Sequence, residues 1–536
     1  MNTSAPDADA PQTVAFWRRW LDAPIQHRPL AVLTCGLIAL AVAAIFSAVR
    51  IPVPHVHDEF SYLLAADTFA KGRLANPTHP HWQHFETFHV IHQPTYASKY
   101  QPGQGAMLAL GSLVGGHPIV GVWLCTALAA AAVCWMLQGW VPGRWALVGG
   151  LLVALHAIIH AQWSLSYWGG ALPMAGGALM FGALPRIKRD THVKDALLLA
   201  AGALLLVATR PYEGFVVGVC VSVALIAWLV RLLVGHKGPK FRVALLQFVV
   251  PATALLAIGL VALGYYNMKI TGDPLRMPYQ VHEATYGFSP LFLWQEPRPL
   301  PEYRHEVMRD FQTGWAIEDY QQQQTFTGWL TSKGTGLVRV GWFYLWVALC
   351  IPLLMLPQLL RSRRLRFAWL TLALFLAAQL MVPWTYAHYF APAAPLLFLV
   401  IVQGLRYLNA LPRAGHNWGR LVALTVIALH VIALPLTFLH HLNGQPEDWQ
   451  WQRAQLASQL ENTPGQHLVF VHYGPDHNSH AEWVYNRADI DGAKIVWARE
   501  LGPERDQALI EYFSERNVWR VEGDEETPGL VTVPDK

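Results

Sequence analysis

The run LAVLTCGLIALAVAAIFSAV (residues 30–49) is followed closely by the polar stretch HVHDEFSYLL (residues 55–64), and this pair indicates the fold of the whole chain. The run has about twenty apolar residues, the length that crosses a bilayer as a helix. It is long for the apolar part of a secretory signal, so we interpret it as a first span that is not cleaved. Basic residues precede it and predict that the N-terminus, residues 1–29, is cytoplasmic.

The overall composition agrees with a membrane protein. Of the 536 residues, 53% are hydrophobic and only 14% are charged, whereas globular proteins average about a quarter charged residues. The formal net charge of +4 is small and resides in short loops. It does not form the basic face that binding to a phosphate backbone requires, so nucleic acid is not an expected partner.

Further apolar stretches of spanning length follow the first one. They lie at about 118–138, 144–162, 171–185, 195–209, 214–234, 243–265, 339–360, 366–383, 390–408 and 421–440. With the first span, they predict an α-helical polytopic membrane protein with about eleven transmembrane helices.

Every second loop between these stretches is basic, as the positive-inside rule requires of cytoplasmic loops. Their basic residues are Arg144; Arg186, Lys188, Arg189 and Lys194; Arg231, Lys237, Lys240 and Arg242; Arg361, Arg363, Arg364 and Arg366; Arg413 and Arg420. The alternate loops are rich in aromatic residues and histidine, which is typical of the membrane surface. We therefore predict a multi-pass protein of the cell inner (plasma) membrane.

Most of the polar residues are predicted to lie outside the cytoplasm. Two long loops, at about 51–117 (the first outer loop) and 266–338 (the second outer loop), interrupt a transmembrane domain of residues 30–440. The tail, residues 441–536, alternates helical and apolar strand patterns and predicts a small extracytoplasmic α/β domain with a parallel sheet. We expect this domain to pack on the outer loops and to help shape a binding surface.

Within the tail, the patterns fall into two helices and two strands. The helices are predicted at 448–460 and 504–516, and the strands at 467–471 and 493–497.

Two adjacent carboxylates, Asp58 and Glu59, open the first outer loop directly after the first span. From Phe60 to Phe69 the apolar residues recur at helical spacing, which predicts a helix lying in the membrane interface. Asp58 can then be a simple N-cap of this helix. Alternatively, the pair can serve acid–base or metal chemistry on a lipid headgroup. The sequence pattern leaves both interpretations open.

Histidines are frequent in the same loop, and His55 and His57 flank Val56 directly before the carboxylates. Histidine is the commonest metal ligand, so a divalent cation such as Mg²⁺, Mn²⁺ or Zn²⁺ is one hypothesis for this site. The alternative is that a solvated outer loop carries these histidines without a shared role, and the spacing matches no defined zinc motif.

The arrangement of the chain resembles the GT-C glycosyltransferases. The shared features are a basic N-terminus, one span, an outer Asp-Glu pair opening a juxtamembrane helix, a long first loop, a many-span bundle and an outer C-terminal domain. Within these enzymes the chain most resembles the protein O-mannosyltransferase, aminoarabinose transferase and Rgt-type branch. The matching residues cluster in the first outer loop and in a few outer turns.

The resemblance implies roles for several residues. It assigns to Asp58 the role of the base that deprotonates the acceptor substrate, or that orients it, and it makes Glu59 the second carboxylate of the pair. The segment YASKYQPG, residues 96–103, is similar to the lysine-plus-proline segment that contacts the lipid phosphate, which places Lys99 at that phosphate. The acidic residue expected just before this lysine is absent, and Glu86 is well upstream.

A second part of the donor site is implied by the outer turn His388-Tyr389-Phe390-Ala391-Pro392. It resembles an Arg-Tyr…Pro turn of the family, with His388 in place of the arginine. A histidine binds phosphate more weakly and in a pH-dependent way. Arg210, at the outer end of another span, can supply the missing fixed charge, or its side chain can simply reach the headgroups.

These observations predict a glycosyltransferase that moves a sugar from a polyprenyl-phosphate donor to a glycan, lipid or protein acceptor on the outer face, and the resemblance implies that the transfer inverts the anomeric carbon. A lipid-linked donor explains why a transferase needs so many spans. The competing interpretations are a non-catalytic sensor of lipids or glycans, in which the Asp-Glu pair is only a cap, and a transporter or flippase. A transporter is typically built from paired internal repeats, and we find none in the sequence.

Overall fold

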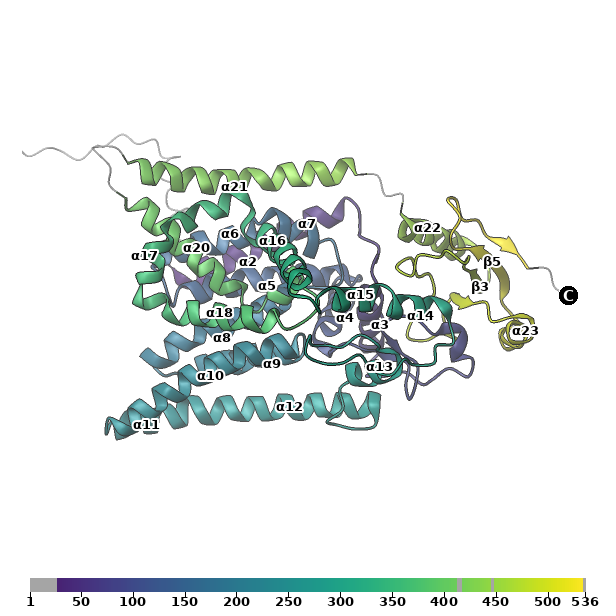
Figure 1. The fold of residues 1–536 in the computed structure, drawn as a ribbon, viewed down its shortest axis with the longest axis horizontal. Coiled ribbons are helices and arrows are strands. Elements are labelled where there is room, and N and C mark those ends of the chain that lie inside the picture. The colour runs from purple at the N-terminus through teal and green to yellow at the C-terminus, as the bar shows by residue number, and fades with distance from the viewer. Residues whose placement is uncertain (1–26, 412–416, 445–447, 534–536) are drawn as a thin grey trace, which may run out of the picture.

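The computed structural model describes residues 27–411, 417–444 and 448–533. Long helices gather at one end of the molecule, and a small domain containing strands forms the other end (Figure 1). Residues 1–26 of the predicted cytoplasmic N-terminus, and Arg413 of the last basic loop, lie outside the described residues.

Six helices in the described part of the chain are long and apolar enough to cross a membrane. They are α2 (Arg28–Ala48), α5 (Ile119–Leu137), α10 (Pro211–Val234), the span Gly238–Thr271 that contains α11 (Gly238–Ala244) and α12 (Val250–Thr271), the span Phe326–Arg361 that contains α16 (Phe326–Cys350) and α17 (Leu356–Arg361), and α21 (Trp418–Asn443). The helices α6 (Gly143–Ala154) and α7 (Ala157–Trp163) bend by 42° and form a seventh crossing if they act together.

Four shorter or more polar helices complete the bundle. They are α8 (Ala171–Arg189), α9 (Val193–Val207), α18 (Arg366–Gln379) and α20 (Ala394–Asn409). The helices α9, α18 and α20 have 15, 14 and 16 residues, which is below the roughly twenty of a straight crossing. Every stretch predicted as a span is thus helical. Length and hydropathy alone single out six or seven of these helices within the described residues.

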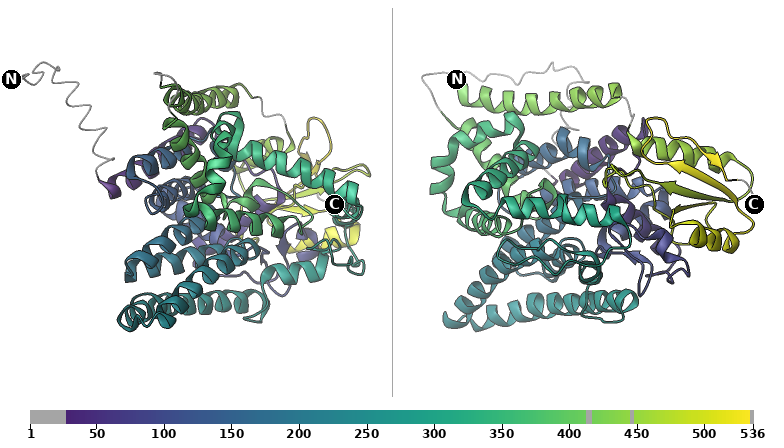
Figure 2. Two further views of the ribbon diagram at one scale, coloured as in Figure 1. Left: turned by 60° about the vertical axis from the view of Figure 1, so that its left-hand side comes forward. Right: turned by 45° about the vertical axis from the view of Figure 1, so that its right-hand side comes forward.

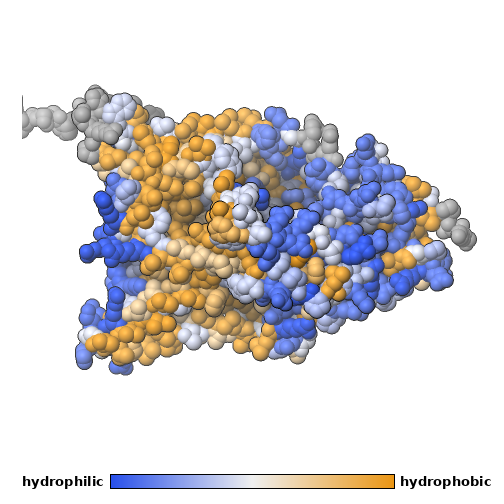
Figure 3. Space-filling view, viewed as in Figure 1, coloured by the Kyte–Doolittle hydropathy of each residue, from blue (hydrophilic) through white to orange (hydrophobic). Residues whose placement is uncertain are grey.

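The surface of the helical end is a broad apolar band with hydrophilic residues at its free end and a hydrophilic small domain at the other (Figure 3). Such a band between two polar ends is what a lipid environment requires. The helices α11 and α17, next to predicted basic loops, lie at the free end, whereas α13 (Pro278–Tyr286) and α15 (Trp315–Gln322) lie toward the small domain (Figure 1). Which end faces the cytoplasm stays a prediction.

The two outer loops carry most of the remaining structure. The first contains α3 (His57–Ala70), η1 (Trp82–Phe85), the short antiparallel strands β1 (Val90–Ile91) and β2 (Ala97–Ser98), and α4 (Pro102–Gly115). The second contains α13, α14 (Glu306–Thr313) and α15. Both loops lie between the bundle and the small domain, as the further views in Figure 2 also show.

The small domain has the α/β fold that the tail predicts. It contains α22 (Trp449–Asn462), β3 (His467–His472), β4 (Ile495–Arg499), α23 (Pro503–Tyr512), β5 (Asn517–Glu522) and β6 (Val531–Thr532). The sheet order is β4-β3-β5-β6, with β3 parallel to both β4 and β5 and with β6 antiparallel. The strands β5 and β6 were not among the predicted elements. Their short, mixed sequences lack the continuous apolar run of β3.

The helix predicted at Phe60–Phe69 forms as α3, and most of its residues are buried within the protein; its position in the membrane interface stays a prediction. Its Phe60 ring stacks on Tyr485 of the small domain with ring centroids 4.0 Å apart, and the Arg453 guanidinium lies over the same ring. The Asp67 carboxylate accepts a hydrogen bond from the Ala488 peptide N–H. The small domain therefore covers the part of α3 around Phe60 and Leu64, whereas Leu63 and Phe69 pack toward α4.

Candidate active site

Asp58 lies in the first turn of α3, where the helix dipole favours an anion. It is not the N-cap, because Val56 occupies that position. The Asp58 carboxylate instead accepts a hydrogen bond from the Tyr100 hydroxyl, and its Oδ2 lies 3.8 Å from His89 Nε2. Its side chain is 31% exposed. The carboxylate is thus held by neighbours on one side and open to a ligand on the other.

Glu59 has a different environment from its neighbour. Its side chain is 0% exposed. Oε2 accepts hydrogen bonds from the peptide N–H groups of His55 and Val56 at 2.8 and 3.3 Å, which caps the helix. Oε1 accepts one from the Tyr167 peptide N–H at 2.7 Å. Glu59 therefore joins the start of α3 to an outer turn of the bundle, and its oxygens are occupied by these contacts.

Lys99 follows β2 and is almost fully buried. Its ammonium lies 3.8 Å from Glu283 Oε1 on α13 and faces the rings of Tyr100 and Tyr279 at 5.4 and 5.2 Å. Burial lowers the pKa of Lys99, and the charges of Glu283 and Asp58 oppose this effect. Lys99 is therefore a buried cation that also acts electrostatically on the Asp58 carboxylate.

Arg210 directly precedes α10, and its charge interacts with those of Glu213 and Asp58. Its guanidinium lies 4.9 Å from the centroid of the Tyr389 ring, and it interacts electrostatically with Asp58. Lys99 and Arg210 are far apart in the sequence, yet both act on one acidic group. This shared electrostatic partner is what one site containing both cations requires. Phosphate binding by this pair stays a prediction.

His388 and Tyr389 lie together in the outer turn. Their ring centroids are 4.5 Å apart, and the His388 ring lies 4.8 Å from Trp168 of another outer turn. Burial and then the nearby Arg210 charge lower the pKa of His388 well below its ordinary value. The imidazole is therefore neutral near pH 7. It can donate a hydrogen bond but does not replace the family's arginine as a charge.

Glu283 is the site residue that sequence reasoning missed. The acidic partner of Lys99 comes from the second outer loop, so no pattern near Lys99 could reveal it. The only signal in the sequence was the absence of a carboxylate before Lys99. A buried ammonium requires a compensating charge, which is the physical reason to search elsewhere in the chain for one.

The proposed metal ligands His55 and His57 do not converge. His55 Nδ1 lies 2.9 Å from Glu59 Oε2, whereas His57 Nδ1 contacts the Tyr485 hydroxyl at 2.8 Å and its ring stacks on Phe88 at 4.2 Å. Among the residues that the structure describes, no group of three or more His, Cys, Asp or Glu is arranged to hold a metal. These residues therefore do not fit a shared ion.

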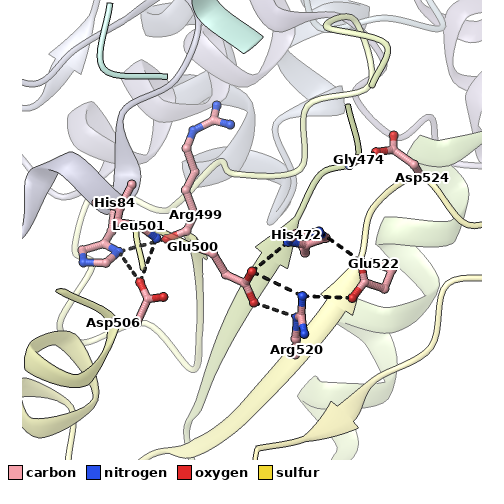
Figure 4. A network of polar contacts seen from close by, with 10 residues as sticks. All are labelled: His84, His472, Gly474, Arg499, Glu500, Leu501, Asp506, Arg520, Glu522 and Asp524. Carbon is pink, nitrogen blue, oxygen red and sulfur yellow. Dashed lines mark hydrogen bonds and ion pairs between the residues drawn. The ribbon is translucent and has the colours of Figure 1, made fainter. Parts of the chain in front are cut away.

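The small domain is anchored to the first outer loop beside this site (Figure 4). His84 Nδ1 contacts the Arg499 carbonyl at 2.9 Å and lies 3.7 Å from Asp506 Oδ1. The Arg499 side chain points the other way and donates to the Glu86 carbonyl at 2.8 Å, while it also pairs with buried Glu482. These contacts fix the segment from His84 to Glu86.

A second group of polar contacts in Figure 4 lies within the small domain, at the carboxyl ends of its strands. His472 and Arg520 both contact Glu500, at 2.8 and 2.7 Å, and Arg520 also contacts Glu522 at 3.3 Å. These side chains are partly exposed. The group links β3, β4 and β5 and is separate from the Asp58 site.

No protein-family model matches the sequence, and no curated protein is significantly similar to it. Solved structures that the chain resembles in fold include GT-C glycosyltransferases. The archaeal oligosaccharyltransferase AglB from Archaeoglobus fulgidus, in complex with an inhibitory peptide and a dolichol-phosphate, is 12% identical with a TM-score of 0.47. The match covers 91% of this chain and 69% of AglB.

Two further structures show similar values. ArnT from Cupriavidus metallidurans bound to undecaprenyl phosphate is 14% identical with a TM-score of 0.48, and 92% of each chain is covered. The arabinosyltransferase EmbB from Mycobacterium smegmatis is 12% identical with a TM-score of 0.41. That match covers 87% of this chain but only 40% of EmbB. Each similarity concerns the fold alone.

Proposed function

We propose that this protein is a membrane glycosyltransferase that moves a sugar from a polyprenyl-phosphate donor to an acceptor hydroxyl at the outer face of the membrane. One observation carries the proposal. A partly exposed carboxylate, Asp58, lies where the apolar bundle meets the outer loops, and two cations, the buried Lys99 and the half-buried Arg210, act on it electrostatically. A base beside two fixed positive charges suits the transfer of a sugar away from a phosphate.

The donor class follows from the place of the site. An isoprenoid tail is apolar and can lie against the apolar band of helices, while its phosphate and sugar reach the polar end of the bundle. The phosphate then meets Lys99 and Arg210, with His388 as a neutral hydrogen-bond donor. Tyr389, whose ring faces the Arg210 guanidinium, holds this cation in place.

The proposed reaction is a single displacement. The acceptor hydroxyl gives its proton to Asp58 while its oxygen bonds to the anomeric carbon of the donor sugar. The bond from that carbon to the phosphate oxygen breaks, and its electron pair leaves with the polyprenyl phosphate. Attack from the face opposite the phosphate inverts the anomeric carbon. The Tyr100 hydroxyl keeps the Asp58 carboxylate oriented toward the acceptor.

Glu59 takes a positioning role in this scheme. Its three hydrogen bonds from peptide N–H groups hold the start of α3, and therefore Asp58, against the outer turn at Tyr167. Positioning a base requires a more precise structure than capping a helix does, because small displacements of a reacting group slow a reaction strongly.

Native mass spectrometry of the purified protein tests the donor class. We expect a polyprenyl phosphate, with or without its sugar, to remain bound to the wild type. A charge-assisted contact contributes about 1.5–3 kcal/mol, so the double variant Lys99→Ala, Arg210→Ala should lose at least tenfold of the bound lipid. The matched control is Lys71→Ala, an exposed cation of the same loop. A wild-type protein that retains only ordinary phospholipids contradicts the proposal.

A further inference from the structure

A cavity of about 570 Å³ lies between the first outer loop and α13. This volume is in the range of small-molecule sites, about 300–1,000 Å³. Its walls include Trp82 and His92 from the first outer loop, and His282, Tyr286 and Arg304 from the second. All of its lining residues belong to these two loops and none to a membrane-crossing helix. The cavity is therefore formed by the outer loops alone.

The cavity shares a wall with the Asp58 site. His282 lines it, and the next residue, Glu283, is the partner of Lys99. The His282 ring centroid lies 5.8 Å from that of His89, whose Nε2 is 3.8 Å from the Asp58 carboxylate. A ligand in the cavity is therefore separated from the Asp58 carboxylate by two side chains, His282 and His89.

Two buried histidines of the wall have unused hydrogen-bonding atoms. His92 and His282 are 2% and 3% exposed, and the Nε2 atom of each has no hydrogen-bond partner among the described residues. Burial lowers the pKa of His92 to about 3 and that of His282 to about 4, so both rings are neutral. A neutral imidazole offers one donor and one acceptor, which suits hydroxyl groups better than a phosphate.

The charge of Arg304 is compensated within the protein. Its guanidinium lies over the Trp82 ring, 4.7 Å from the centroid, and 3.3 Å from Glu86 Oε1. Burial alone raises the pKa of Glu86, but hydrogen bonds from His305 and Tyr286 outweigh it and lower that pKa. Glu86 is therefore ionised opposite Arg304. The cavity thus combines aromatic surface and neutral polar groups without an uncompensated cation.

We propose that this cavity binds a neutral, hydroxyl-rich saccharide, which is the sugar of the acceptor. The inference rests on the proposed glycosyl transfer and adds the chemical class of the second substrate. The aromatic rings of Trp82 and Tyr286 contact the apolar faces of the sugar. The Nε2 atoms of His92 and His282 are covered by the protein, and these rings turn toward the cavity to exchange hydrogen bonds with the hydroxyls of the sugar. The donor's phosphate stays at Lys99 and Arg210, so the cavity is left to the acceptor.

The small domain contacts the segment of the first outer loop that forms one wall of the cavity. Arg499 holds the Glu86 carbonyl, and His84 is tied to β4 and α23 through the contacts drawn in Figure 4. The wall residue Trp82 precedes this anchored segment in η1. The small domain therefore stabilises the wall of the saccharide cavity.

Saturation-transfer NMR on the full-length protein in detergent tests the proposal. The probes are the methyl glycosides of glucose, galactose, mannose and N-acetylglucosamine at millimolar concentrations. We expect at least one probe to bind the wild type. Thr285→Trp places a ring at an exposed position of the cavity rim and should abolish this signal. Ala284→Trp is the control, because it lies next to Thr285, is exposed and does not line the cavity.

Further variants separate the possible outcomes. Trp82→Ala should lower the signal at least tenfold, and Trp82→Phe should retain part of it. Asp58→Asn should bind the probe as the wild type does, so loss of transfer with intact binding separates the cavity from the chemistry. No binding by any probe, or full binding by Thr285→Trp, overturns the proposal. Competition by inorganic phosphate would show an anion site, and competition by polyprenyl phosphate would assign the cavity to the donor; either result also overturns it.

Discussion

The substitution Asp58→Asn removes the proposed base and leaves the local structure nearly unchanged. Asparagine has the same shape, and its carbonyl oxygen can still accept the hydrogen bond from Tyr100. Val56 is the N-cap and Glu59 supplies the capping carboxylate, so α3 loses no cap. Asp58 is also partly exposed. We therefore expect the free energy of unfolding to change by about 1 kcal/mol or less.

The effect on the reaction should be much larger. Removing a positioned base typically slows a reaction by about 10²–10⁴-fold, which corresponds to about 2.7–5.4 kcal/mol in the activation barrier. The assay is the transfer of labelled sugar from the lipid fraction in membranes that contain matched amounts of each variant. Thermal unfolding of the purified proteins provides the stability measurement.

Glu59→Gln is the companion variant, and it should behave in the opposite way. The buried Glu59 carboxylate accepts hydrogen bonds from three peptide N–H groups, and an amide nitrogen cannot accept any of them. We expect a clear loss of stability of about 1–3 kcal/mol and a smaller loss of activity per folded molecule. Wild-type transfer by Asp58→Asn would refute the assignment of the base and favour the sensor interpretation.

Three further predictions concern charge, stability and topology. Glu283→Gln removes a carboxylate that raises the pKa of Lys99 and so opposes the effect of burial. Lys99 should then lose its proton at a lower pH, and polyprenyl phosphate binding should be lost at a lower pH than in the wild type. Binding measured at neutral and alkaline pH checks this. Arg499→Ala leaves buried Glu482 without its cation and should destabilise the protein by about 3–5 kcal/mol, visible as a lower melting temperature. A reporter that is active only outside the cytoplasm, fused after Lys536, should be active, and bright cytoplasmic fluorescence there would show that the span count is wrong.

The membrane helices were predictable because their signal is local. Runs of about twenty apolar residues, with a basic loop after every second run, are visible in the sequence without knowledge of any tertiary contact. The number of crossings is harder to predict, because shorter helices such as α18 and α20 fall below the length of a straight span. The strands β5 and β6 were missed because pairing with neighbours, rather than their own composition, creates them.

The candidate site was predictable only in part. Asp58 was identified by its position after the first span, and Lys99 by the segment around it. The ion pair of Lys99 with Glu283 and the hydrogen bond from the Tyr167 peptide N–H to Glu59 join segments that are distant in the sequence. No spacing pattern in the sequence therefore predicts these two contacts. His388 was expected to carry a pH-dependent charge. Its burial among aromatic rings, which keeps it neutral, is a tertiary property.

The most direct test of the account is a reaction of the purified protein in liposomes. The liposomes contain a sugar-labelled polyprenyl-phosphate fraction and a membrane extract that supplies acceptors. The account predicts that the wild type releases free polyprenyl phosphate over time and moves the label to a new product, while Asp58→Asn does neither. Labelled donor that stays chemically intact, whether it crosses to the other leaflet or remains bound, would contradict the account and indicate a flippase or a sensor.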